Sequence, residues 1–161
     1  MINKLIYKAG VIYRNPSLNA YQKYLKETDK YTIDELEKLQ IEKLKDLLRF
    51  ANNHSIYYRN LFDSVNFNVD DFKDLSELKV IPVTDKKTLI AKNKEIETNY
   101  NFKRTSIAET SGTSGESLKF KRSEFWDSAN RAAMFRFYEW YNVKPWERNG
   151  YFWGYNTKGK S

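Results

Sequence analysis

The chain has 161 residues, of which 40% are hydrophobic and 30% charged, so it can bury a core and is too apolar to be disordered. It contains no cysteine and one histidine, His54, which excludes disulfides, thiolate metal sites and sites built from several histidines. No metal-ligating residue is therefore assigned. The net charge of +7 raises nucleic-acid binding as a minor alternative, because the lysines are dispersed among acidic residues instead of forming a basic stripe.

The first residues are apolar, but Lys4, Lys8 and Arg14 interrupt them and no signal-peptide cleavage site follows. No stretch approaches the roughly 20 apolar residues that are needed to span a bilayer. We therefore expect a cytoplasmic protein without a membrane span.

Helical periodicity dominates the first hundred residues. The clearest helix begins at Thr32, because Thr32 and Glu35 form a capping box, and its apolar positions recur near a 3.6-residue period up to Ala51. Pro82 cannot lie inside a helix, so residues 80–83 are expected to be extended. Further helices are expected at 17–28, 56–62 and 74–78, and from an N-cap at Thr84 through Lys92.

Strands are expected after residue 100. The segments 104–109 and 117–122 have strand character, and in the second Leu118 and Phe120 alternate with lysines. Ser123 then caps a long helix, and a short strand follows at 151–155. The apolar stripe of that helix is expected to contain Phe125, Ala129, Ala132, Ala133, Phe137, Trp140 and Tyr141.

These elements predict an α/β protein, α+β within these 161 residues, in two regions. Residues 1–100 form a helical portion, and residues 101–161 begin an α/β domain that stops after a strand. A sheet interrupted in this way would expose an edge and an apolar face. We therefore expect self-association, for instance as a homodimer.

A run of hydroxyl and glycine residues joins the two predicted strands: Thr110, Ser111, Gly112, Thr113, Ser114 and Gly115. It can be a flexible tether, an ordinary hairpin turn or a cradle for phosphates. Glycines permit the positive φ angles of an anion-binding nest, and the hydroxyls add donors of small size. It is not a Walker A loop, because Glu116 and Ser117 follow where that motif has Lys and Ser or Thr. Composition alone leaves these alternatives open.

Several ordered segments resemble the phenylacetate–CoA ligase-like family of adenylate-forming enzymes, and more narrowly its capsular-polysaccharide-cluster branch. The hydroxyl- and glycine-rich run with its flanks, ETSGTSGESLKFKRSEFW, resembles the family's phosphate loop. The resemblance extends from about Ile33 to the C-terminus, through the segments Leu44–Phe62, Asp71–Asn93 and Tyr151–Gly154.

The resemblance implies that residues 101–161 begin a nucleotide-binding α/β domain and that Thr110 to Gly115 hold the β- and γ-phosphates of Mg-ATP. A small-molecule carboxylate would become an acyl-adenylate, which a thiol such as coenzyme A then captures. Leu118 stands where many such enzymes have Lys or Arg, and Lys119 comes one place later without an assigned role. The family's other motifs lie downstream, so no catalytic residue is assigned. We expect an N-terminal portion of such a ligase without turnover of its own; the alternative is a non-catalytic phosphate-binding module.

Other polar and aromatic residues are assigned structural roles. His54 is expected at a helix end, Arg59 in packing, and Arg131 and Arg136 on a solvated helix surface, with a nucleotide-facing role as their alternative. Three acidic residues are expected to cap helices: Asp70, Asp71 and Asp74. Four tryptophans are expected in the core or at an interface: Trp126, Trp140, Trp146 and Trp153.

Overall fold

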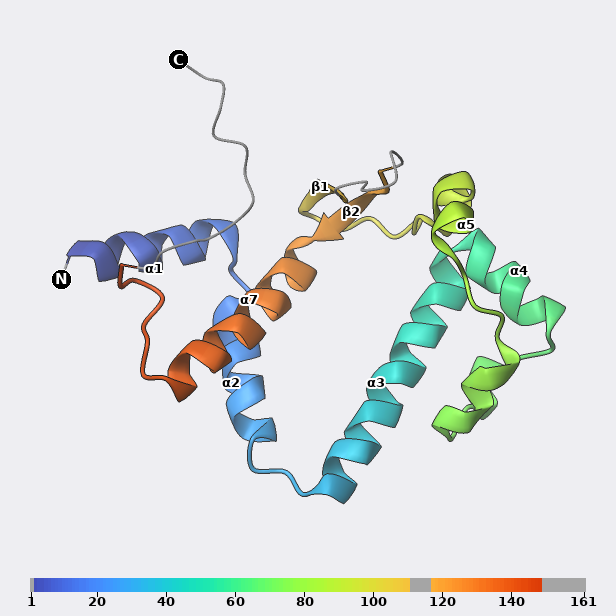
Figure 1. Cartoon of the computed structure of the whole chain (residues 1–161), viewed down its shortest axis with the longest axis horizontal. Coiled ribbons are helices and arrows are strands. Elements are labelled where there is room, and N and C mark those ends of the chain that lie inside the picture. The colour runs from blue at the N-terminus through green and yellow to red at the C-terminus, as the bar shows by residue number, and fades with distance from the viewer. Residues whose placement is uncertain (1, 111–116, 149–161) are drawn as a thin grey trace, which may run out of the picture.

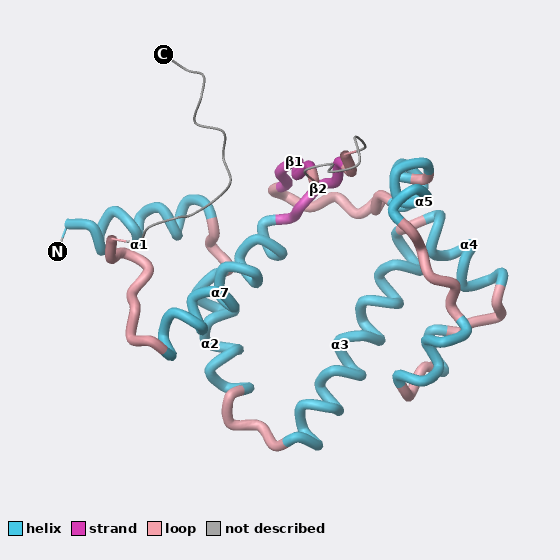
Figure 2. Tube along the Cα trace, viewed as in Figure 1, coloured by secondary structure: helices cyan, strands magenta, loops and turns pink. Residues whose placement is uncertain are grey.

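The computed structural model describes residues 2–110 and 117–148, which form two helical bodies connected at both ends (Figure 1). The first body contains α1 (Ile2–Arg14), α2 (Leu18–Thr28) and α7 (Glu124–Trp140). The second contains α3 (Ile33–His54), α4 (Ile56–Ser64), the 3-10 helices η1 (Val69–Asp71) and η2 (Leu75–Val80), α5 (Lys86–Ala91) and α6 (Asn93–Ile96). An antiparallel hairpin of β1 (Thr105–Glu109) and β2 (Lys119–Ser123) leads into α7. The described fold is α+β and mostly helical (Figure 2).

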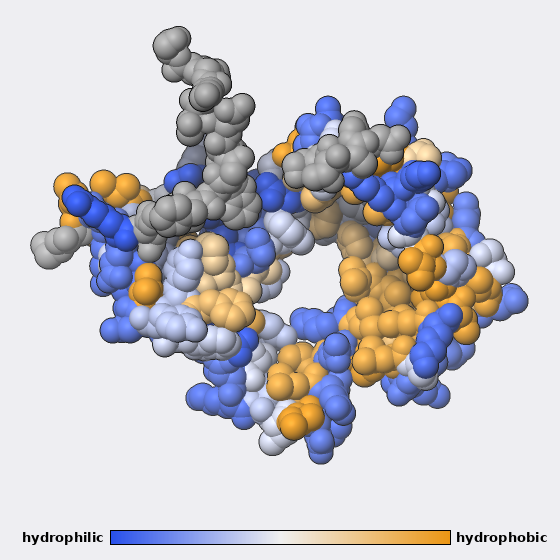
Figure 3. All heavy atoms as spheres, viewed as in Figure 1, coloured by the Kyte–Doolittle hydropathy of each residue, from blue (hydrophilic) through white to orange (hydrophobic). Residues whose placement is uncertain are grey.

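Each body has its own hydrophobic core. In the second body, Leu48, Phe62, Val69 and Phe72 form a buried cluster. In the first body, Leu18 of α2 is buried against two residues of α7. The space-filling view shows an opening between the two bodies (Figure 3). Helix α2 belongs to the predicted region 1–100 and α7 to the predicted region 101–161, and the two helices pack against each other. The boundary at about residue 100 stays a prediction.

The local signals at several helix starts are confirmed. Thr32 and Glu35 form the predicted capping box at the start of α3, with the Thr32 side chain accepting from the Glu35 N–H. The Ser123 hydroxyl accepts from the Trp126 N–H at the start of α7. These caps depend on neighbours three residues away, so the sequence specifies them without tertiary information.

The predicted cap at Thr84 is wrong. Asp85, not Thr84, caps α5, because the Asp85 carboxylate accepts from the Thr88 N–H at 2.7 Å. The Thr84 hydroxyl instead lies 3.2 Å from the Tyr57 hydroxyl of α4. Ser17 precedes α2 but makes no side-chain cap, since its hydroxyl donates to Glu124 of α7 at 2.8 Å.

The predicted buried face of α7 is also wrong. Its buried residues are Ser128, Ala132 and Phe135, of which the predicted stripe contained only Ala132. Other members of that stripe are exposed: Phe125, Phe137, Trp140 and Tyr141. The reason is that α7 carries apolar residues on several sides, and contact with α2 selects the side that becomes the core.

Polar residues in the first turn of α7 hold the junction between α1 and α2. The Glu124 carboxylate accepts from the Ser17 N–H at 3.1 Å and from the hydroxyls of Ser17 and Ser128. The Asp127 carboxylate accepts from the Asn15 amide at 2.8 Å. Desolvation alone would raise the pKa of Glu124, but these hydrogen bonds outweigh it and hold that pKa below its usual value. A carboxylate of α7 thus caps α2 from outside that helix.

Helix α1 was not predicted, because lysines were interpreted only as interruptions of an apolar segment. It packs through Tyr7, whose ring makes an edge contact with Phe135 at 6.0 Å between centroids and a tilted contact with Trp146 at 5.8 Å. The spacing of its apolar residues, at i, i+3, i+4 and i+7, was the signal available in the sequence.

Gly10 in the middle of α1 gives a first prediction. A Cβ at this position would meet only the far end of Arg14, at 3.4 Å, so Gly10→Ala fits without strain. Because glycine in a helix interior costs about 1 kcal/mol relative to alanine, we expect the variant to raise the melting temperature by roughly 2–4 °C. Thermal denaturation followed by circular dichroism measures this. An unchanged or lower melting temperature would show that α1 does not contribute to the cooperative fold.

Candidate functional site

The candidate site is the hairpin that carries the hydroxyl- and glycine-rich loop. The strands pair in antiparallel register, from Thr105 opposite Ser123 to Glu109 opposite Lys119. The strand that the apolar–polar alternation predicted is therefore confirmed as β2. The hairpin continues directly into α7, so the body formed by α1, α2 and α7 supports its base.

Hydrogen bonds close the mouth of the loop. The Thr110 N–H donates to the Leu118 carbonyl at 3.0 Å, and the Leu118 N–H donates to the Thr110 hydroxyl oxygen at 3.0 Å. The Ser117 hydroxyl donates to the Glu109 carboxylate next to this pair. Thr110 is the one predicted phosphate-binding residue that the structure describes; Ser111, Gly112, Thr113, Ser114 and Gly115 lie outside the described residues. The Thr110 hydroxyl accepts a hydrogen bond here and keeps its own proton for donation.

Lysines on one side of the hairpin pair with carboxylates. Lys119, two-thirds exposed, lies 3.7 Å from the Glu109 carboxylate across the strands. Lys121 lies 2.9 Å from Glu97, and the Asn93 amide donates to the Lys119 carbonyl at 2.9 Å. Asn93 of α6 and Glu97, which directly follows that helix, therefore hold the hairpin from one side. They give Lys119 a structural role that its sequence position did not indicate.

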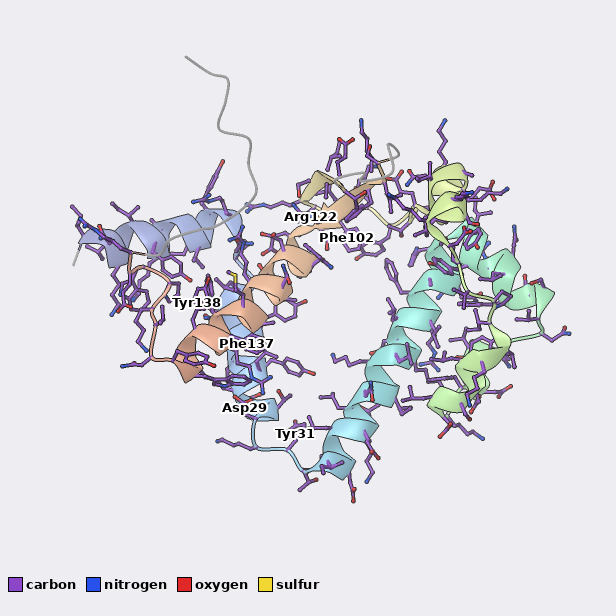
Figure 4. All side chains as sticks on the ribbon, viewed as in Figure 1. Asp29, Tyr31, Phe102, Arg122, Phe137 and Tyr138 are labelled. Atoms are coloured by element: carbon purple, nitrogen blue, oxygen red, sulfur yellow. The ribbon has the colours of Figure 1, made fainter. Side chains whose placement is uncertain are left out.

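A pocket of about 370 Å³ lies at the base of the hairpin. Four aromatic residues line it together with polar groups: Tyr100, Phe102, Phe120 and Trp126. Arg122 of β2 also lines it, and Figure 4 shows Arg122 and Phe102 close to one another near the hairpin. The pocket combines apolar walls with a cation, which suits an organic anion.

Arg122 is the polar group of this pocket that sequence reasoning missed. Its guanidinium lies 5.1 Å from the centroid of the Trp126 ring, a cation–π arrangement. Its Nε is buried and has no acceptor within residues 2–110 and 117–148, and the charge of Arg122 also acts on the Asp127 carboxylate. Because Arg122 lines the pocket, its positive charge lies beside the aromatic walls, where an organic anion would be attracted to it. Its place in the strand alternation, two residues after Phe120, was the available signal.

The other candidate residues have structural partners. The His54 imidazole lies at the end of α3, 2.8 Å from the Asn99 side-chain oxygen, and packs against Phe50 and Tyr100. Arg59 donates to the carbonyls of Asn52 and Asn53, which end α3. Both therefore stabilise the C-terminal end of α3, where the sequence predicted His54; Arg59 is exposed and acts through these hydrogen bonds instead of the predicted packing.

The arginines of α7 both pair with carboxylates. Arg131 contacts Asp127 at 2.9 Å, and Arg136 pairs with Asp29 at the end of α2. In the second body, Asp70 pairs with Arg49 at 2.8 Å, while Asp74 caps η2. These pairs give the four residues structural partners, although the buried Nε of Arg136 has no hydrogen-bond acceptor among the described residues.

Trp126 and Trp140 are partly exposed, whereas Trp146 contacts Tyr7 and Lys4 of α1. Asp71 accepts from the Asn68 amide, and Trp153 lies outside the described residues. In the part of the chain that the structure describes, no three or more acidic or histidine side chains are grouped to hold a metal ion.

Part of the chain is similar in sequence to one kind of enzyme. It is 40% identical over 58 residues to a phenylacetate–coenzyme A ligase of Escherichia coli K12, and 39% identical over 62 residues to one of Aromatoleum evansii. The matches cover 36% and 38% of this chain but only 13% and 14% of the enzymes. No family model matches the chain. The comparisons therefore show partial similarity to CoA ligases over about 60 residues.

Proposed function

We propose that this chain carries the phosphate-binding hairpin of an ATP-dependent enzyme that activates a carboxylate. Thr110, Ser111, Gly112, Thr113, Ser114 and Gly115 bind the β- and γ-phosphates of Mg-ATP through backbone and hydroxyl donors. The observation that carries the proposal is the closed mouth of the loop, where Thr110 and Leu118 exchange two hydrogen bonds at 3.0 Å. A loop whose two ends are fixed loses less conformational entropy when its donors converge on a phosphate than a free tether does.

The proposed reaction has two steps. The carboxylate oxygen attacks the α-phosphorus of ATP, the bond to the β-phosphate breaks, and pyrophosphate leaves. A thiol, proposed to be coenzyme A, then displaces AMP from the acyl-adenylate and forms a thioester. Donors at the loop stabilise the negative charge that gathers on the departing pyrophosphate.

The hairpin-base pocket suits the organic acid. Arg122 supplies a cation whose buried Nε lacks an acceptor among the described residues, and the surrounding aromatic rings can contact an apolar group. Phenylacetate, in the names of the two similar enzymes, combines a carboxylate with a ring. The motifs that resemble the capsular-polysaccharide branch favour an acid of envelope glycan assembly. Acid-dependent ATP–pyrophosphate exchange, measured over a panel of carboxylic acids, would distinguish these substrates.

The loop gives the second prediction. We expect Ser111→Ala combined with Thr113→Ala to weaken Mg-ATP binding by about tenfold or more, since each lost hydrogen bond to a charged group is worth about 1.5–3 kcal/mol. Isothermal titration with the full chain measures the affinity. The matched control is Ser106→Ala, which removes a hydroxyl from β1 of the same hairpin.

Three results would decide the matter. Binding that is weakened by the loop variant and unchanged by Ser106→Ala supports the proposed phosphate site. An absence of binding heat with Mg-ATP, or equal affinity in both variants, would refute it. Mg-ATP binding that no carboxylic acid influences would favour the alternative of a phosphate-binding module without chemistry.

A further inference from the structure

The more apolar side of α1 faces solvent. Its exposed apolar residues follow helical spacing and form one stripe, here called the α1 stripe: Ile2, Leu5, Ile6, Ala9, Ile12 and Tyr13. The five larger ones are 64% to 78% exposed. Hydrophobic atoms are visible along the outer edge of α1 in the space-filling view (Figure 3). A continuous apolar stripe of this kind indicates a surface that binds something.

Contacts on the opposite side of α1 fix this orientation. Tyr7 packs against Phe135 and Trp146, and the Lys4 ammonium lies 5.1 Å from the centroid of the Trp146 ring. At the end of the helix, the Arg104 guanidinium donates to the Tyr13 carbonyl at 2.6 Å. The stripe therefore cannot rotate inward without breaking the contacts that attach α1 to α7 and the hairpin.

The charged residues of α1 itself are all basic. They are Lys4, Lys8 and Arg14, and the helix contains no acidic residue; Glu139 of α7 lines a groove with Lys8 and Ile12. Lys8 lies three residues from Leu5 and four from Ile12, so it borders the stripe. The occupant must accordingly offer both an apolar layer and negative charge.

We propose that α1 lies in the interface of a membrane that contains anionic lipids, with the α1 stripe inserted among the acyl chains. Amphipathic helices with basic residues bind such interfaces through buried apolar area and attraction to anionic headgroups. A 13-residue helix is about 20 Å long and cannot cross a hydrocarbon core of about 30 Å, so it lies on the membrane. Across the described part of the chain, no helix is both long and apolar enough to cross a membrane.

A second copy of this chain fits the stripe less well. Two α1 helices packed face to face would bring together two helices that each carry three cations and no carboxylate. Such like-charge contact is unfavourable, whereas an anionic lipid surface is complementary. This inference is independent of the nucleotide chemistry proposed for the hairpin.

Vesicle flotation with the full chain tests the proposal. The vesicles are phosphatidylcholine alone or mixed equally with phosphatidylglycerol. We expect binding to the anionic vesicles, weakening by about tenfold or more in Leu5→Ser combined with Ile12→Ser, and weakening at high salt. The matched control is Ile33→Ser combined with Val83→Ser, which removes two equally exposed apolar residues outside α1 and should leave binding unchanged.

Folding and self-association are checked on the same samples. Both double variants alter exposed side chains, so their circular dichroism spectra and melting temperatures should match the parent. Binding that is equal on neutral vesicles, or that survives loss of the stripe, would refute the proposal. So would a sedimentation experiment in which the parent forms dimers that the Leu5→Ser, Ile12→Ser variant loses, since a second copy would then occupy the stripe.

Discussion

Replacing Phe72 with alanine is expected to lower the free energy of unfolding by about 3–5 kcal/mol, because the side chain is only 1% exposed and its removal leaves a cavity. Phe72 closes the core of the second body against Phe67 and the buried Leu48, Phe62 and Val69. Urea denaturation measures the loss. The control is Val83→Ala, at a side chain that is 97% exposed, and should change stability by less than about 0.5 kcal/mol.

The location of the damage tests the division into two cores. Hydrogen exchange should become faster in α3 and α4 of the Phe72→Ala variant and stay near its original rate in α2 and α7. The reason is that each cluster is formed by residues of its own body. Equal acceleration in all four helices would contradict this and show that the two bodies unfold as one unit.

Glu124→Ala is expected to have the next largest effect, a loss of about 2–3 kcal/mol of stability. The substitution leaves the fully buried Ser128 hydroxyl and the Ser17 N–H without their acceptor. Glu139→Ala is the matched control, because Glu139 lies on the same helix but makes an exposed ion pair with Lys26. A stability loss of similar size in both variants would mean that the hydrogen bonds of Glu124 at Ser17 stabilise the fold no more than an exposed ion pair does.

Acid should weaken the same junction. The pKa values of Glu124 and Asp127 are lowered in the folded chain because, although desolvation raises them, hydrogen bonds from Ser128, Ser17 and Asn15 outweigh that effect. In the unfolded chain these carboxyls have ordinary pKa values of about 4.3 for Glu and about 3.9 for Asp, so the unfolded chain takes up protons before the folded chain as the pH falls. Stability from these groups is fully present above about pH 5 and falls as the pH drops through the folded values. Glu124→Gln should flatten this part of the pH profile in urea titrations.

The elements that sequence predicts well are those specified by near neighbours. The capping box of Thr32 and Glu35, the Ser123 cap and the hairpin alternation all involve residues a few positions apart or the period of one strand. The closed mouth of the loop follows from the same short-range pairing. For the candidate site, these local signals were sufficient to predict the hairpin stem around Thr110.

The parts that sequence did not predict depend on distant partners. On α7, the polar residues Glu124, Asp127 and Ser128 lie on the side that packs against α2. The turn at Asn15 and Ser17 supplies donors for the two carboxylates, and the Ser128 hydroxyl donates to Glu124. A prediction that buries the apolar residues of a helix would expose this polar side of α7 to solvent. The Arg122 pocket was missed for the same reason, since its aromatic walls come from the segment before β1, from β2 and from α7.

The contact between Ser17 and Glu124 also determines which part of the chain can fold first during synthesis. Glu124 leaves the ribosome 107 residues after Ser17, an interval of about 5–20 seconds at ordinary elongation rates. All core residues of the second body lie between Ile41 and Ile81, so that body can fold during this wait. Leu18 and Leu25 of α2 meanwhile have no α7 to cover them. The apolar residues of the nascent N-terminal segment therefore stay uncovered until α7 emerges.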